Sequence, residues 1–301
     1  MWTAIALWIS NGLLVAGYVV VAMRHVAGGG ALWPWIVAAP FVYFAIVFVL
    51  TAVYFAIAWA RRSPRPADRR LGARASWRLF VREYLALAGA MPRLLAYRRI
   101  GRDPPPAAAR RPVLLLHGVL CNAGVWRSMK RRLSEAGVGP LYTLSYGPPL
   151  ASIDLFAGQA ARKIDEILAE TGASQVAIVA HSMGGLVARA YLRRYGTAKV
   201  RKVITIGTPH SGSVHAWMFP GASLAQLRPG NAWLAALPMP SRGESPPFVS
   251  LWSWHDSMVA PQVSARIDGG RNIEVSGVGH NALLTDPDVA RRVIEELKAA
   301  D

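Results

Sequence analysis

A serine, an acid and a histidine each follow an apolar, strand-like run in this sequence, in that chain order. The run at residues 176–180 stops at His181-Ser182-Met183-Gly184-Gly185, and Asp256 and His280 follow two later runs. A serine hydroxyl is a poor nucleophile at neutral pH, so it needs a base within hydrogen-bond reach. A histidine supplies that base, and a carboxylate fixes the tautomer of its ring. Ser182, His280 and Asp256 are therefore candidates for nucleophile, base and orienting acid.

The turn at Ser182 also has a simpler interpretation. A serine before a helical pattern is commonly an N-cap, whose hydroxyl accepts a hydrogen bond from the backbone of the helix. Ala180 also stands where the G-x-S-x-G nucleophile turn has its first glycine, so the pentapeptide alone leaves both interpretations open. The later acid and histidine favour the nucleophile, because Ser, Asp, His is one of the known chain orders of such sites. A methyl group is the smallest side chain after hydrogen, so Ala180 fits the same turn.

Two backbone amides are candidates to stabilise the oxyanion that forms when a serine attacks an ester carbonyl. Met183 directly follows the serine, and Val119 lies in the loop after the first expected strand. Loss of one such donor typically costs about 3 kcal/mol or more in the transition state. Gly118 and Gly184 allow the backbone to approach closely at these two turns.

The elements that must position these groups alternate between strand and helix from residue 112 onward. We expect strands at 113–116, 141–145, 176–180, 203–206, 248–252 and 273–276, and helices at 125–135, 153–170, 185–195 and 286–299. Such alternation predicts an α/β fold, a mostly parallel sheet with helices on both faces. Loops at the carboxyl ends of parallel strands face one crevice, which brings the candidate groups together.

Five motifs together resemble the lipase and esterase branch of the α/β-hydrolases. They are Leu116-His117-Gly118-Val119, Ala180-His181-Ser182-Met183-Gly184-Gly185, Gly207-Thr208-Pro209-His210-Ser211-Gly212, Asp256 with Val259-Ala260-Pro261, and Gly279-His280. The A-H-S-M-G form is similar to some bacterial lipases. The G-T-P-H-S-G stretch is similar to bacterial triacylglycerol lipases and to the GPI inositol-deacylase group. The resemblance covers residues 112–299 and implies that Ser182, Asp256 and His280 form a catalytic triad.

Several residues near these motifs have alternative roles. Asp268 is a second candidate for the orienting acid. His117 and His181 lie beside the proposed oxyanion donors and are expected to support the structure there. His210 is expected to brace its loop, with the role of rival base as the alternative. Cys121, the single cysteine, lies in the oxyanion loop without a sharp turn and is expected to be a buried thiol.

One segment interrupts the alternation of strands and helices. Residues 213–247 separate two expected strands and are rich in Trp, Met, Leu, Pro and Gly. Connections of this length are uncommon in compact domains and are often functional. We expect a lid over an acyl pocket, and the alternative is a packed pair of helices without a role in substrate binding.

The first sixty residues predict a pair of membrane spans at about 2–23 and 38–60. No charged side chain occurs from residue 1 to 23 or from 28 to 60, and the mean hydropathy of the chain is +0.26. About 20 apolar residues cross a bilayer core. A cleaved signal peptide is the alternative for the first span, but no basic leader or cleavage site is present. Because of Pro34 and Pro40, we expect the second regular helix to begin near Phe41.

An arginine-rich segment follows the second expected span. Residues 61–111 carry fourteen arginines against three acids, out of a net charge of +17 for the chain. Basic segments next to a span favour the cytoplasmic side and bind anionic lipid, so we expect a lipid surface and not nucleic acid. The stretch 77–87 predicts a helix that lies along the membrane surface or packs on the following domain. The single cysteine agrees with a reducing compartment.

These observations predict three regions, a transmembrane hairpin at 1–60, a juxtamembrane segment and linker at 61–111, and a catalytic α/β-hydrolase domain at 112–301. We expect a membrane-anchored serine hydrolase of the inner membrane that cleaves carboxylic esters of lipids, with its catalytic domain in the cytoplasm. An acyltransferase or thioesterase with the same triad and a catalytically silent scaffold are the alternatives. No metal site and no cofactor site is expected, and the oligomeric state is left open.

Overall fold

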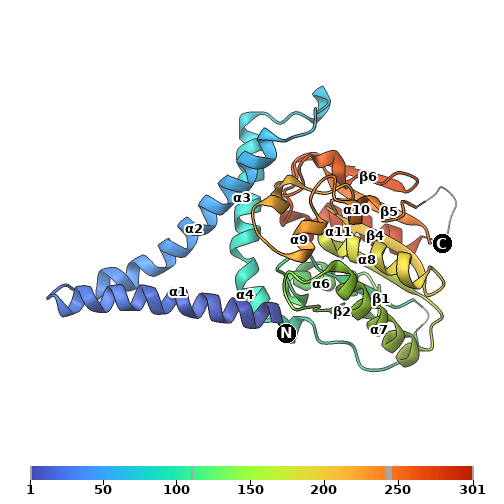
Figure 1. Cartoon of the computed structure of the whole chain (residues 1–301), viewed down its shortest axis with the longest axis horizontal. Helices are drawn as coiled ribbons and strands as arrows, with labels where there is room; N and C mark the ends of the chain where they lie inside the picture. Colours follow the sequence, from blue (N-terminus) through green and yellow to red (C-terminus); the bar gives the residue numbers. More distant parts are fainter. Residues whose placement is uncertain (1, 110, 241–245, 300–301) are drawn as a thin grey trace.

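The computed structural model describes residues 2–109, 111–240 and 246–299, with the backbone alone for residues 2–8, 10 and 11, and its centre is a parallel sheet (Figure 1). The sheet has six strands in the order β2-β1-β3-β4-β5-β6, and every neighbouring pair is parallel. The strands are β1 (Val113–Leu116), β2 (Leu141–Leu144), β3 (Val176–His181), β4 (Val200–Ile206), β5 (Phe248–Ser253) and β6 (Arg271–Val275). The predicted α/β architecture is confirmed.

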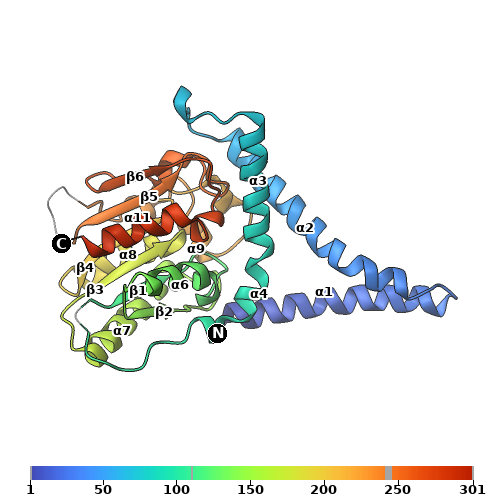
Figure 2. The same cartoon turned by 180° about the vertical axis from the view of Figure 1, so that it is seen from behind.

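Helices cover both faces of the sheet, as Figure 2 shows. Successive side chains of a strand point to opposite faces. Leu114 and Leu116 of β1 therefore pack with α7 (Ile153–Thr171) and α8 (Met183–Tyr195), whereas Val113 and Leu115 pack with α6 (Arg127–Glu135) and α11 (Pro287–Lys298). The helix expected at 125–135 begins as a 3₁₀ turn, η2 (Ala123–Trp126), and continues as α6.

The insertion expected at 213–247 forms short helical pieces that pack on the α7 and α8 side. They are η3 (Val214–Trp217), α9 (Ala222–Gln226) and α10 (Ala232–Ala235). Its leucines, Leu224, Leu227, Leu234 and Leu237, are buried in the same apolar cluster as the strands and α7 and α8. Residues 241–245 of this insertion lie outside the described residues. The inner side of the insertion is therefore part of the core, as the packed alternative expects.

Two long helices, α1 (Trp2–Ala27) and α2 (Trp33–Ala60), project from the sheet domain and meet at the turn at residues 28–32, which lies far from the sheet (Figure 1). Within the part of the chain that the structure describes, one helix, α2, is long and apolar enough to cross a membrane. The described side chains of α1 give only a shorter apolar stretch, Gly12–Ala27, so the expectation of two spans is not supported.

The expected start of the second helix near Phe41 is wrong, because α2 begins at Trp33. Pro34 lies in the first turn, where an amide N–H has no partner within the helix and a proline is tolerated. Pro40 lies inside the helix and removes one backbone hydrogen bond without ending it. Apolar helices of this kind accommodate a proline more often than soluble ones do.

The helix α3 (Ala73–Ala88) lies between α2 and the sheet domain, and the short helices α4 (Ala90–Leu95) and α5 (Tyr97–Ile100) follow it (Figure 2). On one side, the Phe80 ring lies 5.2 Å from Phe48 and 5.7 Å from Phe55 of α2. On another side, Glu83 is buried against the sheet domain. Of the two predictions for residues 77–87, packing on the following domain is therefore the one observed, with Trp77 still exposed.

Candidate active site

Ser182 occupies the sharp turn between β3 and α8. Its backbone has φ 56° and ψ −129°, a strained conformation for a residue with a side chain. The Ser182 amide donates to the Ile206 carbonyl at 2.9 Å, and the Thr208 hydroxyl donates to the Ser182 carbonyl at 2.8 Å. The Ser182 hydroxyl makes no capping hydrogen bond with α8. The turn thus holds this side chain away from the role of an ordinary N-cap.

Two glycines make room for this turn. A Cβ atom at Gly118 would lie 2.9 Å from the Ser182 Cβ and 3.4 Å from its Oγ. A Cβ atom at Gly184 would lie 2.3 Å from the Leu116 carbonyl oxygen, so α8 could not begin so close to the end of β1. Both contacts are shorter than, or at the limit of, what a real side chain allows. The sequence motifs around Gly118 and Gly184 therefore reflect direct steric requirements.

Asp256 and His280 form a buried pair at the ends of β5 and β6. The His280 Nδ1 donates to the Asp256 Oδ2 at 2.9 Å, and the Met258 and Val259 amides each donate to Oδ1 at 2.8 Å. Asp268, the second candidate acid, is exposed in the loop before β6. With Nδ1 as donor, the Nε2 of His280 is left as the acceptor that a general base requires.

The charges around His280 favour its protonated form. Burial lowers the pKa of His280, but the Asp256 carboxylate, by its charge and its hydrogen bond, and the Glu83 charge together raise that pKa above its ordinary value. A base of raised pKa accepts a proton more readily. The pair is therefore suited to general-base chemistry near neutral pH.

The serine turn and the histidine loop meet through His181, the residue before Ser182. The ring centroids of His181 and His280 are 4.7 Å apart, and the His181 Nε2 donates to the His280 carbonyl at 3.2 Å. No hydrogen bond joins the Ser182 hydroxyl to the His280 ring in the described ranges of the chain. Such bonds are often long without substrate and tighten when it binds.

The two candidate oxyanion donors flank Ser182. Met183 is the first residue of α8, so its amide N–H has no acceptor within the helix. Val119 follows Gly118, whose backbone lies against the serine side chain. The structure places both residues beside the turn, and their role in stabilising an oxyanion stays a prediction.

The comparisons with known proteins point to one fold. The model of the alpha/beta hydrolase fold family matches residues 153–233. A triacylglycerol lipase of Burkholderia plantarii is 32% identical over 168 residues, 50% of this chain and 44% of that protein. A triacylglycerol lipase of Pseudarthrobacter phenanthrenivorans is 32% identical over 123 residues, 36% of each protein. The chain thus spans less than half the length of these curated relatives.

Among solved structures, the match to Aspergillus fumigatus lipase B covers 68% of this chain and 57% of the lipase chain, with a TM-score of 0.57 and 21% identity. The match to Bacillus licheniformis lipase BlEst2 in its mature form covers 66% of this chain and 94% of the lipase chain, with a TM-score of 0.54 and 17% identity. The chain has the alpha/beta hydrolase fold. The fold expected from its motifs and their resemblance to lipases are confirmed.

Two further histidines, His117 and His181, contact the backbone around the turn. The His117 Nδ1 donates to the Gly118 carbonyl at 2.8 Å, and its ring stacks on Tyr146 with centroids 3.9 Å apart. Burial lowers the pKa of His117 to about 4, and burial together with the His280 charge lowers that of His181 well below its usual value. Both rings are therefore neutral near pH 7 and hold the backbone beside Ser182.

His210 and Cys121, the other groups singled out in the sequence, contact neither Asp256 nor His280 through any described hydrogen bond. The His210 Nε2 lies 3.1 Å from the Thr205 hydroxyl, and its carbonyl accepts from the Arg189 guanidinium at 2.9 Å. Burial raises the pKa of the Cys121 thiol to about 12. This thiol is neutral near pH 7 and is not an activated nucleophile.

Glu83 is the residue of this site that the sequence analysis missed. It comes from α3, which precedes the first strand of the sheet, and it is 2% exposed. Its carboxylate accepts hydrogen bonds from Ser257, in the loop of Asp256, and from Asn281 and Ala282, in the loop of His280. A signal was present, because Glu83 lies on the same helical stripe as the buried Leu79 and Ala86. An acid on the apolar stripe of a helix predicts a buried polar contact.

An apolar cavity of about 450 Å³ lies between α2, α3 and the loop of Asp256. Its walls include Phe55 and Trp59 of α2 and Phe80 of α3, and Asp256 and His255 also line it. The apolar helix α2 and the loop that carries the acid thus face the same cavity. Among the described residues, no group of histidine, cysteine and acidic side chains could hold a metal ion.

Proposed function

We propose that this protein is a membrane-anchored serine hydrolase that cleaves carboxylic esters of lipids through an acyl-enzyme. The observation that carries the proposal is the strained turn of Ser182 beside the buried pair of His280 and Asp256. Nucleophilic catalysis by serine requires a hydroxyl that is free of a capping role and an imidazole that is held in one orientation. The similarity to triacylglycerol lipases supports an ester substrate.

The chemistry follows from these positions. The Ser182 Oγ attacks the ester carbonyl carbon while the His280 Nε2 takes the hydroxyl proton. The oxyanion of the tetrahedral intermediate accepts hydrogen bonds from the Met183 and Val119 amides. When the intermediate collapses, the alcohol leaves with the proton from His280, and Ser182 keeps the acyl group. A water molecule then attacks the acyl carbon while His280 takes its proton. The bond to the Ser182 Oγ breaks, His280 returns the proton to Oγ, and the carboxylic acid leaves. Asp256 stabilises the charged imidazole in both steps.

The membrane location rests on α2. Its side chains are mostly exposed, as with Phe41 at 68%, and exposed apolar surface of this extent is unfavourable in water. By the positive-inside rule, the basic segment after α2 favours a cytoplasmic location for the hydrolase domain. A topology reporter fused to the C-terminus is expected to read cytoplasmic, and a periplasmic reading would contradict this. A pair of spans with both ends on that side, and the regions 1–60, 61–111 and 112–301, remain predictions.

The insertion at 213–247 is the proposed cover of the acyl pocket. Its anchor is Arg189 of α8, which donates to the carbonyls of His210, Leu237 and Pro238. Its outer side exposes Trp217 at 62% and Phe219 at 45%. Large exposed apolar side chains next to a site favour contact with lipid.

The test is a series of p-nitrophenyl acyl esters of increasing chain length, given to the full-length protein in detergent. Ser182→Ala is expected to lower kcat by about 10⁴-fold or more with an unchanged Tm. Ser211→Ala, an exposed serine of the neighbouring loop, is the matched control and should keep full activity. Activity that survives Ser182→Ala would refute the mechanism. Product analysis with a lipid alcohol present separates hydrolysis from acyl transfer, and fluorophosphonate labelling of Ser182 excludes an inactive scaffold.

A further inference from the structure

The first inference concerns Glu83, whose carboxylate reaches the active site from the N-terminal segment. Its Oε1 accepts from the Ser257 hydroxyl at 2.8 Å and from the Asn281 amide N–H and side-chain amide at 2.9 Å each. Its Oε2 accepts from the Ala282 amide at 2.9 Å. Ser257 follows the proposed acid and Asn281 follows the proposed base. One carboxylate therefore holds both loops.

The backbone around His280 packs closely on this carboxylate. A Cβ atom at Gly279 would lie 2.5 Å from the Glu83 Oε2, so the loop passes directly over the acid. The Ser257 hydroxyl that donates to Glu83 also accepts from the His280 amide at 3.3 Å. A short chain of hydrogen bonds thus links α3 to the backbone of His280.

A second contact ties the same N-terminal segment to the loop of Asp256. The Ser63 amide, three residues after α2, donates to the Gln262 Oε1 at 3.0 Å, and the Val263 amide donates to the Ser63 hydroxyl at 3.0 Å. The buried Gln262 side chain in turn donates to the Asp256 carbonyl at 3.2 Å. The segment that follows the membrane-type helix is therefore attached to both loops.

We propose that Glu83 is a positioning residue, supplied by the N-terminal segment, that holds the loop of His280 against Asp256. This proposal rests on the proposed serine hydrolase function. It implies that the hydrolase domain reaches full activity only with α3 docked. The membrane-proximal segment is then part of the catalytic unit and not merely a tether.

The electrostatics provide a readout that a purely structural role would not change. The titratable groups facing His280 are Asp256 from the β5 loop, Glu83 from α3, His181 from β3 and His215 from η3. Of these, the two carboxylates raise the pKa of His280. Glu83→Gln keeps the shape but removes one charge. The pKa of His280 should fall, and the acidic limb of kcat/KM should move to lower pH.

The experiment compares pH profiles of kcat/KM for full-length wild type, Glu83→Gln and Glu83→Asp in detergent. Glu83→Gln is expected to lower kcat about tenfold and to move the limb by about half a pH unit or more. Glu83→Asp keeps the charge but shortens the reach, so the limb should stay and kcat should fall. Glu135→Gln, an exposed acid on α6, is the control and should match wild type.

Each outcome has a separate meaning. Unchanged kcat and an unchanged limb in both Glu83 variants would overturn the proposal. If Glu83→Gln does not fold, as judged by Tm, the test rests on Glu83→Asp alone. An unchanged kcat in Glu83→Asp would then overturn the proposal. If wild-type activity does not depend on Ser182, the proposed function fails. A failure at Glu83 with intact dependence on Ser182 overturns only this inference.

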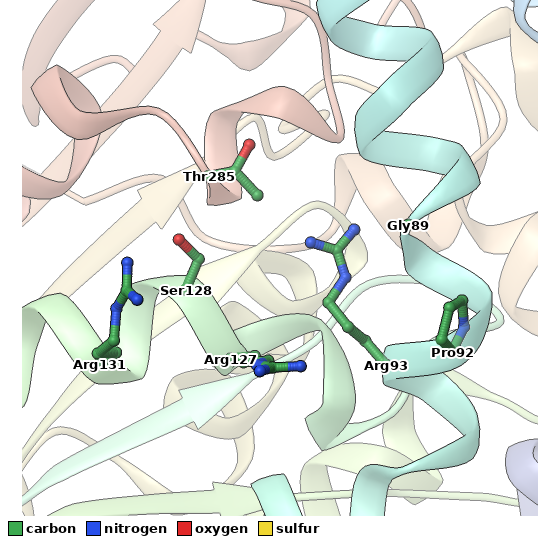
Figure 3. Close-up of a pocket in the computed structure, with 7 residues that line it drawn as sticks. All are labelled: Gly89, Pro92, Arg93, Arg127, Ser128, Arg131 and Thr285. Atoms are coloured by element: carbon green, nitrogen blue, oxygen red, sulfur yellow. The ribbon is translucent and has the colours of Figure 1, made fainter.

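The second inference comes from a different observation, a basic cavity between α4 and α6 (Figure 3). Its volume is about 570 Å³, and no acid lines it among the described residues. Its polar lining consists of Arg93, Arg127 and Arg131 with the hydroxyls of Ser128 and Thr285. Figure 3 shows the Arg93 guanidinium reaching from α4 toward Thr285, with Ser128 and Arg131 on the facing helix.

Among the described residues, Arg93 and Arg127 of this cavity have no acidic partner. The Arg93 Nε is buried with no hydrogen-bond partner in the described part of the chain, while its Nη2 donates to the Ala86 carbonyl at 2.6 Å. Burial and the nearby Arg127 charge lower the pKa of Arg93. Only Arg131 has an acid near it, the exposed Glu135 at 3.7 Å. An anion with several oxygens would accept bonds from these donors and neutralise the repulsion.

We infer that this cavity binds a phosphate group, that of an anionic phospholipid. Guanidinium forks and hydroxyls are the groups that bind phosphate oxygens. The lipid source is favoured because α4 follows α3 directly, and α3 packs on the membrane-type helix α2. The site lies apart from Ser182 and does not depend on the proposed catalytic function.

The test measures the Tm of the full-length protein in detergent with dioctanoyl phosphatidic acid, dioctanoyl phosphatidylcholine or inorganic phosphate. A ligand that binds the folded state raises Tm with concentration. Phosphatidic acid is expected to raise Tm by several degrees in wild type and in Arg99→Gln, an exposed control on α5. In Arg93→Gln and Arg127→Gln the rise should disappear.

The remaining outcomes are informative as well. An equal rise with inorganic phosphate would overturn the lipid assignment and leave free phosphate as the ligand. A rise in the two cavity variants that equals wild type, or no rise with any probe, would overturn the inference altogether.

Discussion

The two sides of the proposed active site are held in different ways. On the serine side, the turn is held from neighbouring strands and the loops that follow them, with Thr208 after β4 donating to the Ser182 carbonyl and Gly118 after β1 lying against its side chain. On the histidine side, the loop is held by Glu83, whose contact with Asn281 joins residues 198 positions apart. The position of the proposed nucleophile thus depends on the sheet and its loops, whereas the position of the proposed base depends on a segment from outside the sheet.

The largest effect expected on the histidine side comes from Asp256→Asn. The amide has nearly the same shape but cannot hold the imidazole in the required tautomer or stabilise its charge, so kcat should fall by about 10⁴-fold. Steady-state kinetics on a short-chain p-nitrophenyl ester measures this. Asp268→Asn, at the exposed alternative acid, is the control. If Asp268→Asn caused the larger loss, the acid would have been assigned wrongly.

A smaller but still large effect is expected on the serine side from Gly118→Ala. The added methyl would lie 2.9 Å from the Ser182 Cβ, so either the oxyanion loop or the serine must move. Displacements of about 1 Å at a reacting group cost roughly 100-fold in rate, and we expect a loss of that size in kcat. Gly72→Ala, where a Cβ meets nothing within 4 Å, is the matched control. Full activity of Gly118→Ala would show that the loop tolerates the shift.

The contrast between the two sides also explains what could be predicted from the sequence. The turn at Ser182 was visible because its requirements are local, small residues between an apolar strand and a helix. The strands and the positions of Asp256 and His280 at their ends followed from the same alternation. Glu83 was missed, since a long-range contact leaves no periodic pattern beyond one acid on an apolar stripe. The start of α2 was misplaced because proline rules for soluble helices were applied to an apolar helix that carries Pro40 in its interior.

The pH dependence of wild type sharpens the account of the histidine side. The unprotonated base is the active form, and the carboxylates of Asp256 and Glu83 raise the pKa of His280 above its ordinary value of about 6.5. Below the raised pKa, kcat/KM should therefore fall about tenfold for each pH unit. The limb should lie above pH 6.5, and a profile that stays flat down to pH 5 would be incompatible with His280 as the base.

The smallest effect is expected from Thr208→Val, which tests how far the serine side depends on any single bond. Valine fills the same volume but cannot donate to the Ser182 carbonyl, a contact of 2.8 Å made by a fully buried hydroxyl. An unsatisfied buried acceptor costs about 1–3 kcal/mol in the free energy of unfolding. Because the Ser182 amide remains bonded to the Ile206 carbonyl, the turn should persist and kcat should fall less than tenfold. Chemical denaturation and kinetics, with the exposed Thr197→Val as control, measure both quantities. A loss of activity as large as that of Gly118→Ala would mean that the strained turn depends on this one hydroxyl and not on the sheet around it.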